Sequence, residues 1–146
     1  MSDDDFRGFA SGAGVAAIER FENAEDSGDL DVAAASVSEA LFWWGVVNGS
    51  GPAPSTDDEV SEALRFARNC AAHRRVATRT QKGRGWPREW PTRYGKRLKW
   101  ASTDFVEVGA RDLHKSTVQT QRAAYDSRLS GRDVAPLLVE VRAFLE

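Results

Sequence analysis

The chain is 146 residues long, a size usual for one domain, and its single cysteine excludes both an internal disulfide framework and a cysteine-based zinc site. No apolar run approaches the roughly 18 residues of a transmembrane helix, and the acidic start of the chain is unlike a signal peptide. We therefore expect one cytoplasmic domain over residues 1–146, with no membrane span, no cofactor and no bound metal.

The small net charge of −2 conceals three blocks of different charge. Residues 1–62 carry 14 acids and two bases, a sum of −12, whereas residues 63–100 carry 12 bases and one acid, a sum of +11. The rest carries six bases and seven acids, a sum of −1. A block this basic in an otherwise acidic chain is a candidate surface for a polyanion. Neutralisation of the acidic half, within the fold or across a dimer, is an equal alternative.

Apolar periodicity predicts two helices in the acidic half. A first helix is expected over about 13–24, ended by a polar turn at 26–29. The second helix has the clearest pattern and stops at Asn48-Gly49. Trp43 lies beside its apolar stripe and is a candidate for a partner surface. The stripe consists of Leu30, Ala33, Val37, Ala40, Leu41, Trp44 and Val47.

A third helix is predicted to begin near Thr56, which opens a capping-box pattern with three acids that suit the positive end of the helix dipole. It is expected to run to about Val76 or Thr78. Its apolar stripe consists of Val60, Ala63, Leu64, Ala67, Cys70 and Ala71.

A basic, Trp-rich insert follows over 79–108 and has no helical period. Within it, 98–100 and 105–108 are candidates for two extended pieces of one hairpin. A fourth helix is predicted over 116–129, and Asp133 is expected to cap a last helix. The stripe of that last helix consists of Val134, Leu137, Leu138, Val141 and Leu145. The fold class is therefore all-α, a bundle of four to five helices with one long irregular basic connection.

The third helix carries polar side chains away from its apolar stripe. At 100° per residue, Asn69 and His73 lie one turn apart on a shared face, and His73 lies about 120° from the centre of the stripe. Arg68 lies to one side, but its long side chain can swing toward His73. Phe66 and Val76 lie on the same outer face, which suggests a second buried surface such as a dimer interface.

The run Arg68-Asn69-x-x-x-His73 resembles the Arg-x4–6-His motif of HEPN domains (higher eukaryotes and prokaryotes nucleotide-binding). In that family a polar residue, often Asn, commonly follows the Arg directly. Leu64 and Ala67 are similar to the local context of the motif, and the closing stretch 125–134 resembles the end of some small bacterial members. An Arg and a His at this spacing are common by chance, so the resemblance rests on the Asn after the Arg, the helical context and the predicted bundle.

The resemblance implies a metal-independent endoribonuclease, such as a toxin or a phage-defence effector, with a composite site at a homodimer interface. Carried over to this chain, Arg68 would bind the scissile phosphate and stabilise its developing charge. His73 would move protons to or from the 2′-hydroxyl or the leaving oxygen. Asn69 would orient the histidine or bond the phosphate.

The insert and its neighbours form a predicted RNA-binding surface. Arg and Lys side chains can follow phosphates while aromatic faces stack on unpaired bases. The alternative for the insert's tryptophans is packing over the core, which we favour for Trp86 and Trp90. The candidate RNA-binding residues are Arg65, Arg74, Arg75, Arg79, Lys82, Arg84, Arg88 and Trp90.

The alternative function is a non-catalytic helical module that binds RNA or a protein partner. We expect RNA and a second copy of the chain as partners, with a protein antitoxin or inhibitor as a further candidate. An imidazole of His73 plugged into the hydrophobic interior would exclude the nuclease, because a general acid or base must reach its substrate.

Overall fold

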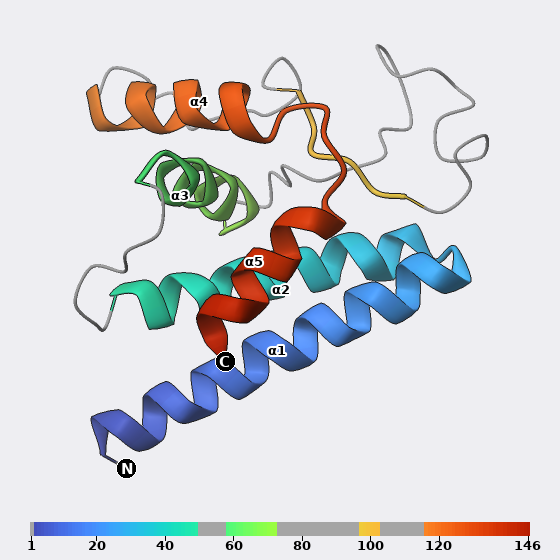
Figure 1. The fold of residues 1–146 in the computed structure, drawn as a ribbon, viewed down its shortest axis with the longest axis vertical. Helices are drawn as coiled ribbons and strands as arrows, with labels where there is room; N and C mark the ends of the chain where they lie inside the picture. The colour runs from blue at the N-terminus through green and yellow to red at the C-terminus, as the bar shows by residue number, and fades with distance from the viewer. Residues whose placement is uncertain (1, 50–57, 73–96, 103–115) are drawn as a thin grey trace.

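The computed structural model describes residues 2–49, 58–72, 97–102 and 116–146. Within these ranges the chain is an all-α bundle, as predicted, and has no β-strand. Its helices are α1 (Asp3–Ser27), α2 (Leu30–Gly49), α3 (Asp58–Ala72), α4 (Ser116–Arg128) and α5 (Ala135–Leu145) (Figure 1). Most of the predicted basic insert, including 105–108, lies outside the described residues.

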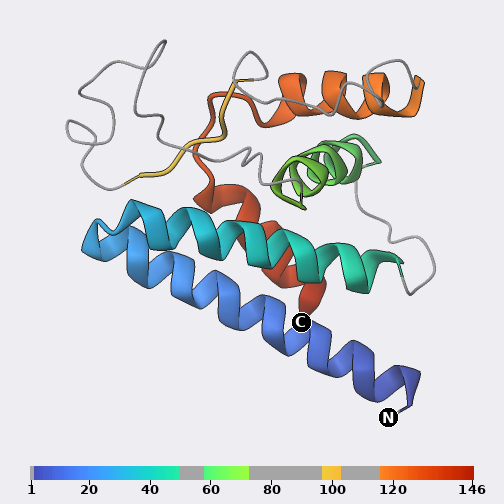
Figure 2. The ribbon, with the colours of Figure 1, turned by 180° about the vertical axis from the view of Figure 1, so that it is seen from behind.

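The helices pack as two pairs, α1 with α2 and α3 with α4, which meet where α3 contacts α2. α1 and α2 form an antiparallel pair, and α5 crosses them on one side (Figure 1). Seen from behind, α2 lies in front of α5, and α3 lies between α2 and α4 (Figure 2). α3 contacts both of these helices, so two sides of it are covered and only a narrow outer face remains.

α1 begins at Asp3, well before the predicted start near residue 13, because its first turn is capped. The Ser2 hydroxyl accepts the backbone N–H of Asp5 at 3.2 Å, and the Asp5 carboxylate accepts the backbone N–H of Ser2 at 3.0 Å. This reciprocal capping box offsets the low helix propensity of Gly8 and Gly12 in the turns that follow. The spacing of apolar residues, which predicted this helix, gives no information about a polar cap.

α2 confirms the predicted second helix, and its whole predicted stripe except Leu30 is buried. By length and composition alone it is also apolar enough to cross a membrane, with a mean hydropathy of 1.3, contrary to the expectation that no segment is. In the bundle α2 packs against α1, α3 and α5, and buried core helices share this composition. Trp44 is buried, as predicted.

The interpretation of Phe66 as part of an outer surface is wrong. Its side chain is only 2% exposed, and its ring centroid lies 5.1 Å from that of Tyr125 on α4. The Tyr125 hydroxyl donates a 2.6 Å hydrogen bond to the carbonyl of Ala101, and burial raises the pKa of this phenol far above its ordinary value. The second apolar side of α3 is therefore covered by α4 of the same chain.

Asp133 does not cap α5 as predicted. The N-cap position belongs to Val134, which has no side-chain acceptor, and Pro136 lies in the first turn, where a missing N–H costs little. Asp133 instead forms ion pairs with Arg97 at 3.4 Å and with Lys99 at 4.0 Å. It is also bridged to Lys99 through the backbone, so the extended piece at 98–100 pairs with the segment before α5.

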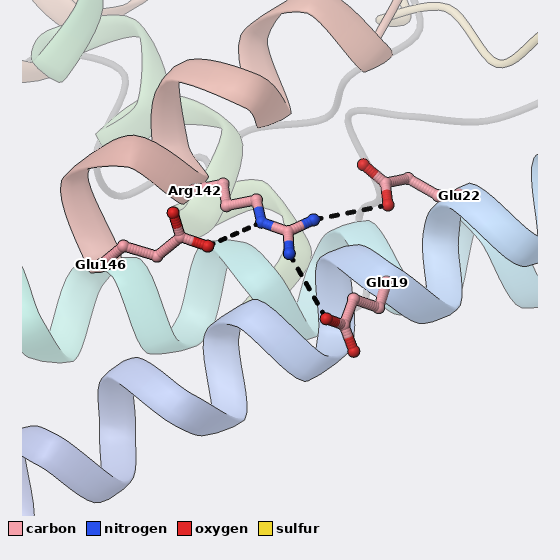
Figure 3. Close-up of polar contacts among 4 residues, drawn as sticks. All are labelled: Glu19, Glu22, Arg142 and Glu146. Carbon is pink, nitrogen blue, oxygen red and sulfur yellow. Dashed lines mark hydrogen bonds and ion pairs between the residues drawn. The ribbon is translucent and has the colours of Figure 1, made fainter.

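A single arginine ties the end of α5 to the middle of α1. Arg142 pairs with Glu19 at 3.3 Å, with Glu22 at 3.6 Å and with Glu146 at 2.8 Å (Figure 3). One guanidinium thus serves three carboxylates, so the cluster keeps a net negative charge. The acidic character of the N-terminal half is not cancelled at this contact.

Alanine substitutions at two glycines of α1 test its close packing. A Cβ atom at Gly14 would lie 2.6 Å from Leu145 Cδ1 and 3.2 Å from Trp43 Cβ, whereas one at Gly12 would meet nothing within 4 Å. Gly12→Ala is expected to raise the free energy of unfolding by about 0.5–1 kcal/mol through helix propensity. Gly14→Ala is expected to be at least about 1 kcal/mol less stable than Gly12→Ala, because it overpacks the contact. Urea denaturation followed by circular dichroism measures both; equal values would contradict this packing.

Candidate functional site

The outer face of α3 carries the exposed members of the candidate site. Arg65 and Asn69 are both exposed and lie one helical turn apart, so they share a face. Arg65 forms an ion pair with Glu62, one turn before it on the same helix. The opposite sides of α3 are buried, and Cys70 points into the core as predicted. The face is therefore a polar strip between the covered sides of the helix.

Arg68 leaves this strip and lies across α2. A Cβ atom at Gly45 of α2 would lie 2.5 Å from Arg68 Cδ and 2.8 Å from Arg68 Cζ, so the arginine stem and guanidinium occupy the space that a side chain at position 45 would need. Arg68 as a whole is only partly buried. Its guanidinium group is therefore anchored at the seam between α2 and α3.

Two buried polar atoms, one on α3 and one on α2, lack hydrogen-bond partners within the described part of the chain. One is Nε of Arg68, a donor, and the other is Oδ1 of Asn48, an acceptor; both atoms are buried. Asn48 lies three residues after Gly45, so it lies on the same side of α2. A buried guanidinium N–H without an acceptor costs free energy, so a ligand oxygen that reached it would be bound favourably.

The candidate residues are thus only partly brought together by the described structure. Arg65 and Asn69 share the outer face, and Arg68 borders it from the α2 side. His73 lies outside the described residues, as do the remaining candidate RNA-binding residues Arg74, Arg75, Arg79, Lys82, Arg84, Arg88 and Trp90. The predicted approach of Arg68 to His73 therefore stays a prediction.

Gly45 is a member of the site that the sequence interpretation missed. A glycine inside an otherwise apolar helix costs about 1 kcal/mol relative to alanine, and such a residue commonly marks a close approach of another group. Gly45 stands between Trp44 and Val46 in the middle of α2, so this signal was present in the sequence. What the sequence could not identify was the group that fills the space.

The arrangement suits recognition of an anion rather than coordination of a cation. Within the described ranges, no group of three or more His, Cys, Asp or Glu side chains is placed to hold a metal ion. The described hollows, of about 310, 230 and 570 Å³, do not include Arg68 or Asn69 in their linings, although Val60 of α3 lines the first two. The candidate site therefore lies at the helix seam and not in these cavities.

No protein-family model matches the chain, and neither a curated protein nor a solved structure matches it.

A double-mutant cycle tests the contact between Gly45 and Arg68. Gly45→Ala adds a methyl group where Arg68 lies, so in the wild-type background its effect combines a helix-propensity gain with displacement of the guanidinium. In an Arg68→Ala background the displacement is absent. We expect the two backgrounds to differ by about 0.5–3 kcal/mol in the free energy of unfolding, measured with urea.

Gly49→Ala is the matched control for this cycle, because a Cβ atom at Gly49 would meet nothing within 4 Å. Its effect should be the same in both backgrounds. Additive effects of Gly45→Ala and Arg68→Ala would show that the two residues do not interact.

Proposed function

We propose that the protein is a metal-independent endoribonuclease of the HEPN type, with Arg68, Asn69 and His73 as its catalytic residues. The observation that carries this proposal is Arg68 anchored on the backbone of α2 at Gly45, with a buried Nε that has no acceptor among the described residues. An arginine fixed in this way is a ready-made donor for a phosphate oxygen.

The chemistry follows from these side-chain types. The 2′-hydroxyl of RNA attacks the adjacent phosphorus, the bond to the 5′-oxygen of the next nucleotide breaks, and a 2′,3′-cyclic phosphate is left. His73 takes the proton from the 2′-hydroxyl or gives one to the leaving oxygen, as an imidazole of pKa near 6.5 can do. Arg68 stabilises the extra negative charge on the phosphoryl oxygens, which develops in the transition state.

Asn69 and Arg65 support the same chemistry from the outer face of α3. Asn69 is exposed directly beside Arg68 in the chain, where its amide can orient the histidine or bond the phosphate. Arg65, one turn earlier on the same face, extends positive charge along the path of an RNA backbone. Its partner Glu62 is on the same helix, and such an exposed pair is weak enough to be broken by a phosphate.

Trp100, one of the tryptophans of the insert, is not available to bind RNA. Trp100 is completely buried and packs edge-on against Tyr125, with ring centroids 6.4 Å apart. It therefore stabilises the core and is not offered to a base. The other aromatic residues of the insert, Trp86, Trp90 and Tyr94, lie outside the described residues, and Trp90 stays the candidate for stacking on RNA.

Each copy would contribute one motif to a composite site in a homodimer. Two copies of Arg68 and His73 would then supply one group to stabilise the phosphate and one to transfer the proton. The alternative function is a non-catalytic helical module that binds RNA or a protein. Under this alternative, the Arg68 side chain would serve only to join α3 to α2.

Cleavage of total RNA in the presence of EDTA tests the proposal. We expect the purified protein to produce fragments that end in cyclic phosphate, because no metal takes part. His73→Ala and Arg68→Ala should each lower the rate by at least about 100-fold, since general acid–base and charge-stabilising groups contribute factors of this size. The rates are measured from fragment patterns on denaturing gels.

Arg7→Ala is the matched control, because Arg7 is an exposed arginine on α1, outside the proposed site. It should cleave like the wild type. Intact RNA at high protein concentration, together with a gel shift that survives His73→Ala, would identify the protein as a non-catalytic binder.

A further inference from the structure

An aromatic surface lies exposed at one end of the α1–α2 pair. It consists of Phe6 and Phe9 of α1 and Phe42 and Trp43 of α2. Phe9 is 59% exposed and Phe42 is 48% exposed. Trp43 joins them, because its ring centroid lies 5.6 Å from that of Phe9 and 5.0 Å from that of Phe42. A contiguous cluster of exposed rings of this kind marks an interaction site more often than single exposed apolar residues do.

The geometry of the helix pair explains why this surface is open. α1 and α2 converge at their connection and diverge toward the N-terminus of α1 in both views (Figures 1 and 2). Of the residues before Gly14 in α1, only Ala10 is buried. Gly8 and Gly12 have nothing within 4 Å of their would-be Cβ atoms, so a helix backbone could approach α1 closely there. The first turns of α1 thus expose aromatic rings and two glycines, and no described element covers them.

The charge around this surface restricts what can cover it. α1 and α2 together contain nine acidic and two basic residues, and three of the acids, Asp3, Asp4 and Asp5, form the first turn of α1 beside Phe6. Arg20 is already held by Glu39 at 2.5 Å, and α2 contains no basic residue. A partner that covers the rings therefore gains from positive charge at the edge of its apolar face.

Two other occupants fit this charge poorly. A second copy that presented the same surface would place two sets of Asp3, Asp4 and Asp5 close together, with only Arg7 of each copy as a nearby base to offset them. A membrane with anionic lipids would repel the acidic turn, because surface binding of this kind relies on basic residues. A basic partner is attracted instead.

We propose that the aromatic surface docks an amphipathic helix of another protein, one that is apolar on one face and rich in Lys or Arg along its edges. The rings of Phe9, Phe42 and Trp43 receive apolar side chains at helical spacing, and the first turn of α1 pairs with the basic edge. This inference is independent of the ribonuclease proposal, because it uses no residue of the proposed catalytic site.

Fluorescence anisotropy with the full chain and labelled 18-residue peptides tests the docking surface. The probe is a peptide with Leu at helical spacing on one face and Lys elsewhere; its controls are a scrambled peptide of the same composition and a Leu/Glu peptide with the same spacing. We expect the Leu/Lys helix to bind at least about tenfold more tightly than either control, because it offers both the apolar face and the positive charge.

Variants then locate the binding. Phe42→Ser alone and combined with Phe9→Ser should each weaken the Leu/Lys peptide, the double variant by at least about tenfold, while thermal unfolding stays close to that of the wild type. Asp3→Asn with Asp4→Asn should weaken it by a few-fold and reduce its salt dependence. Val139→Ser is the matched control, because Val139 is a 62% exposed apolar residue of α5 and should leave binding unchanged.

Three results would overturn the proposal. The first is equal binding of the scrambled peptide, or binding that survives the double phenylalanine variant. The second is a dimer in sedimentation velocity that the double variant converts to a monomer, which would assign the surface to a second copy. The third is tighter binding to phosphatidylcholine–phosphatidylglycerol vesicles than to the peptide, lost in the same variant, which would assign it to a lipid surface.

Discussion

The arrangement of this bundle depends on α3 being enclosed on two sides. On one side Phe66 and its neighbours are covered by α4 through Tyr125, whose hydroxyl is satisfied by the carbonyl of Ala101. On the other side Arg68 lies in the space left by Gly45 of α2. Because both sides are filled, the exposed positions of α3 with described side chains are Glu59, Arg65 and Asn69, and Arg68 lies beside them at the contact with α2.

The contact between Arg68 of α3 and Gly45 of α2 bears on both stability and the candidate site. The Arg68 side chain occupies the space beside Gly45, so a larger residue at position 45 would have to displace it. The same packing leaves Nε of Arg68 and Oδ1 of Asn48 without partners among the described residues. Unsatisfied buried groups are costly in a folded protein, and sites of this kind are frequently those where a ligand supplies the missing contact.

The described helices differ in charge: α1 and α2 are acidic, whereas α3 carries Arg65 and Arg68. The α1–α2 pair stays acidic in the folded chain, because Arg142 is shared by three carboxylates and Arg20 serves only Glu39 (Figure 3). Among the described residues, the basic block reaches the acids of this pair at Glu25, which accepts the backbone N–H of Leu98 at 3.0 Å and lies near the charge of Arg97. An acidic helix pair with exposed rings and a separate arginine-bearing helix are consistent with one protein partner and one anionic partner at different surfaces.

Local signals in the sequence predicted the helices, since the 3.6-residue period of α2 and α5 and the Asn48-Gly49 stop signal at the end of α2 depend only on near neighbours. They also placed Asn69 outside and Cys70 inside. Tertiary packing alone decided the roles of Phe66, Asp133 and Arg68. Phe66 is buried because α4 covers a second side of α3, and Asp133 pairs with Arg97 and Lys99 instead of capping a helix. Arg68 turns toward Gly45, and no spacing within α3 records which helix lies beside it, because contacts between distant segments leave no period in the sequence.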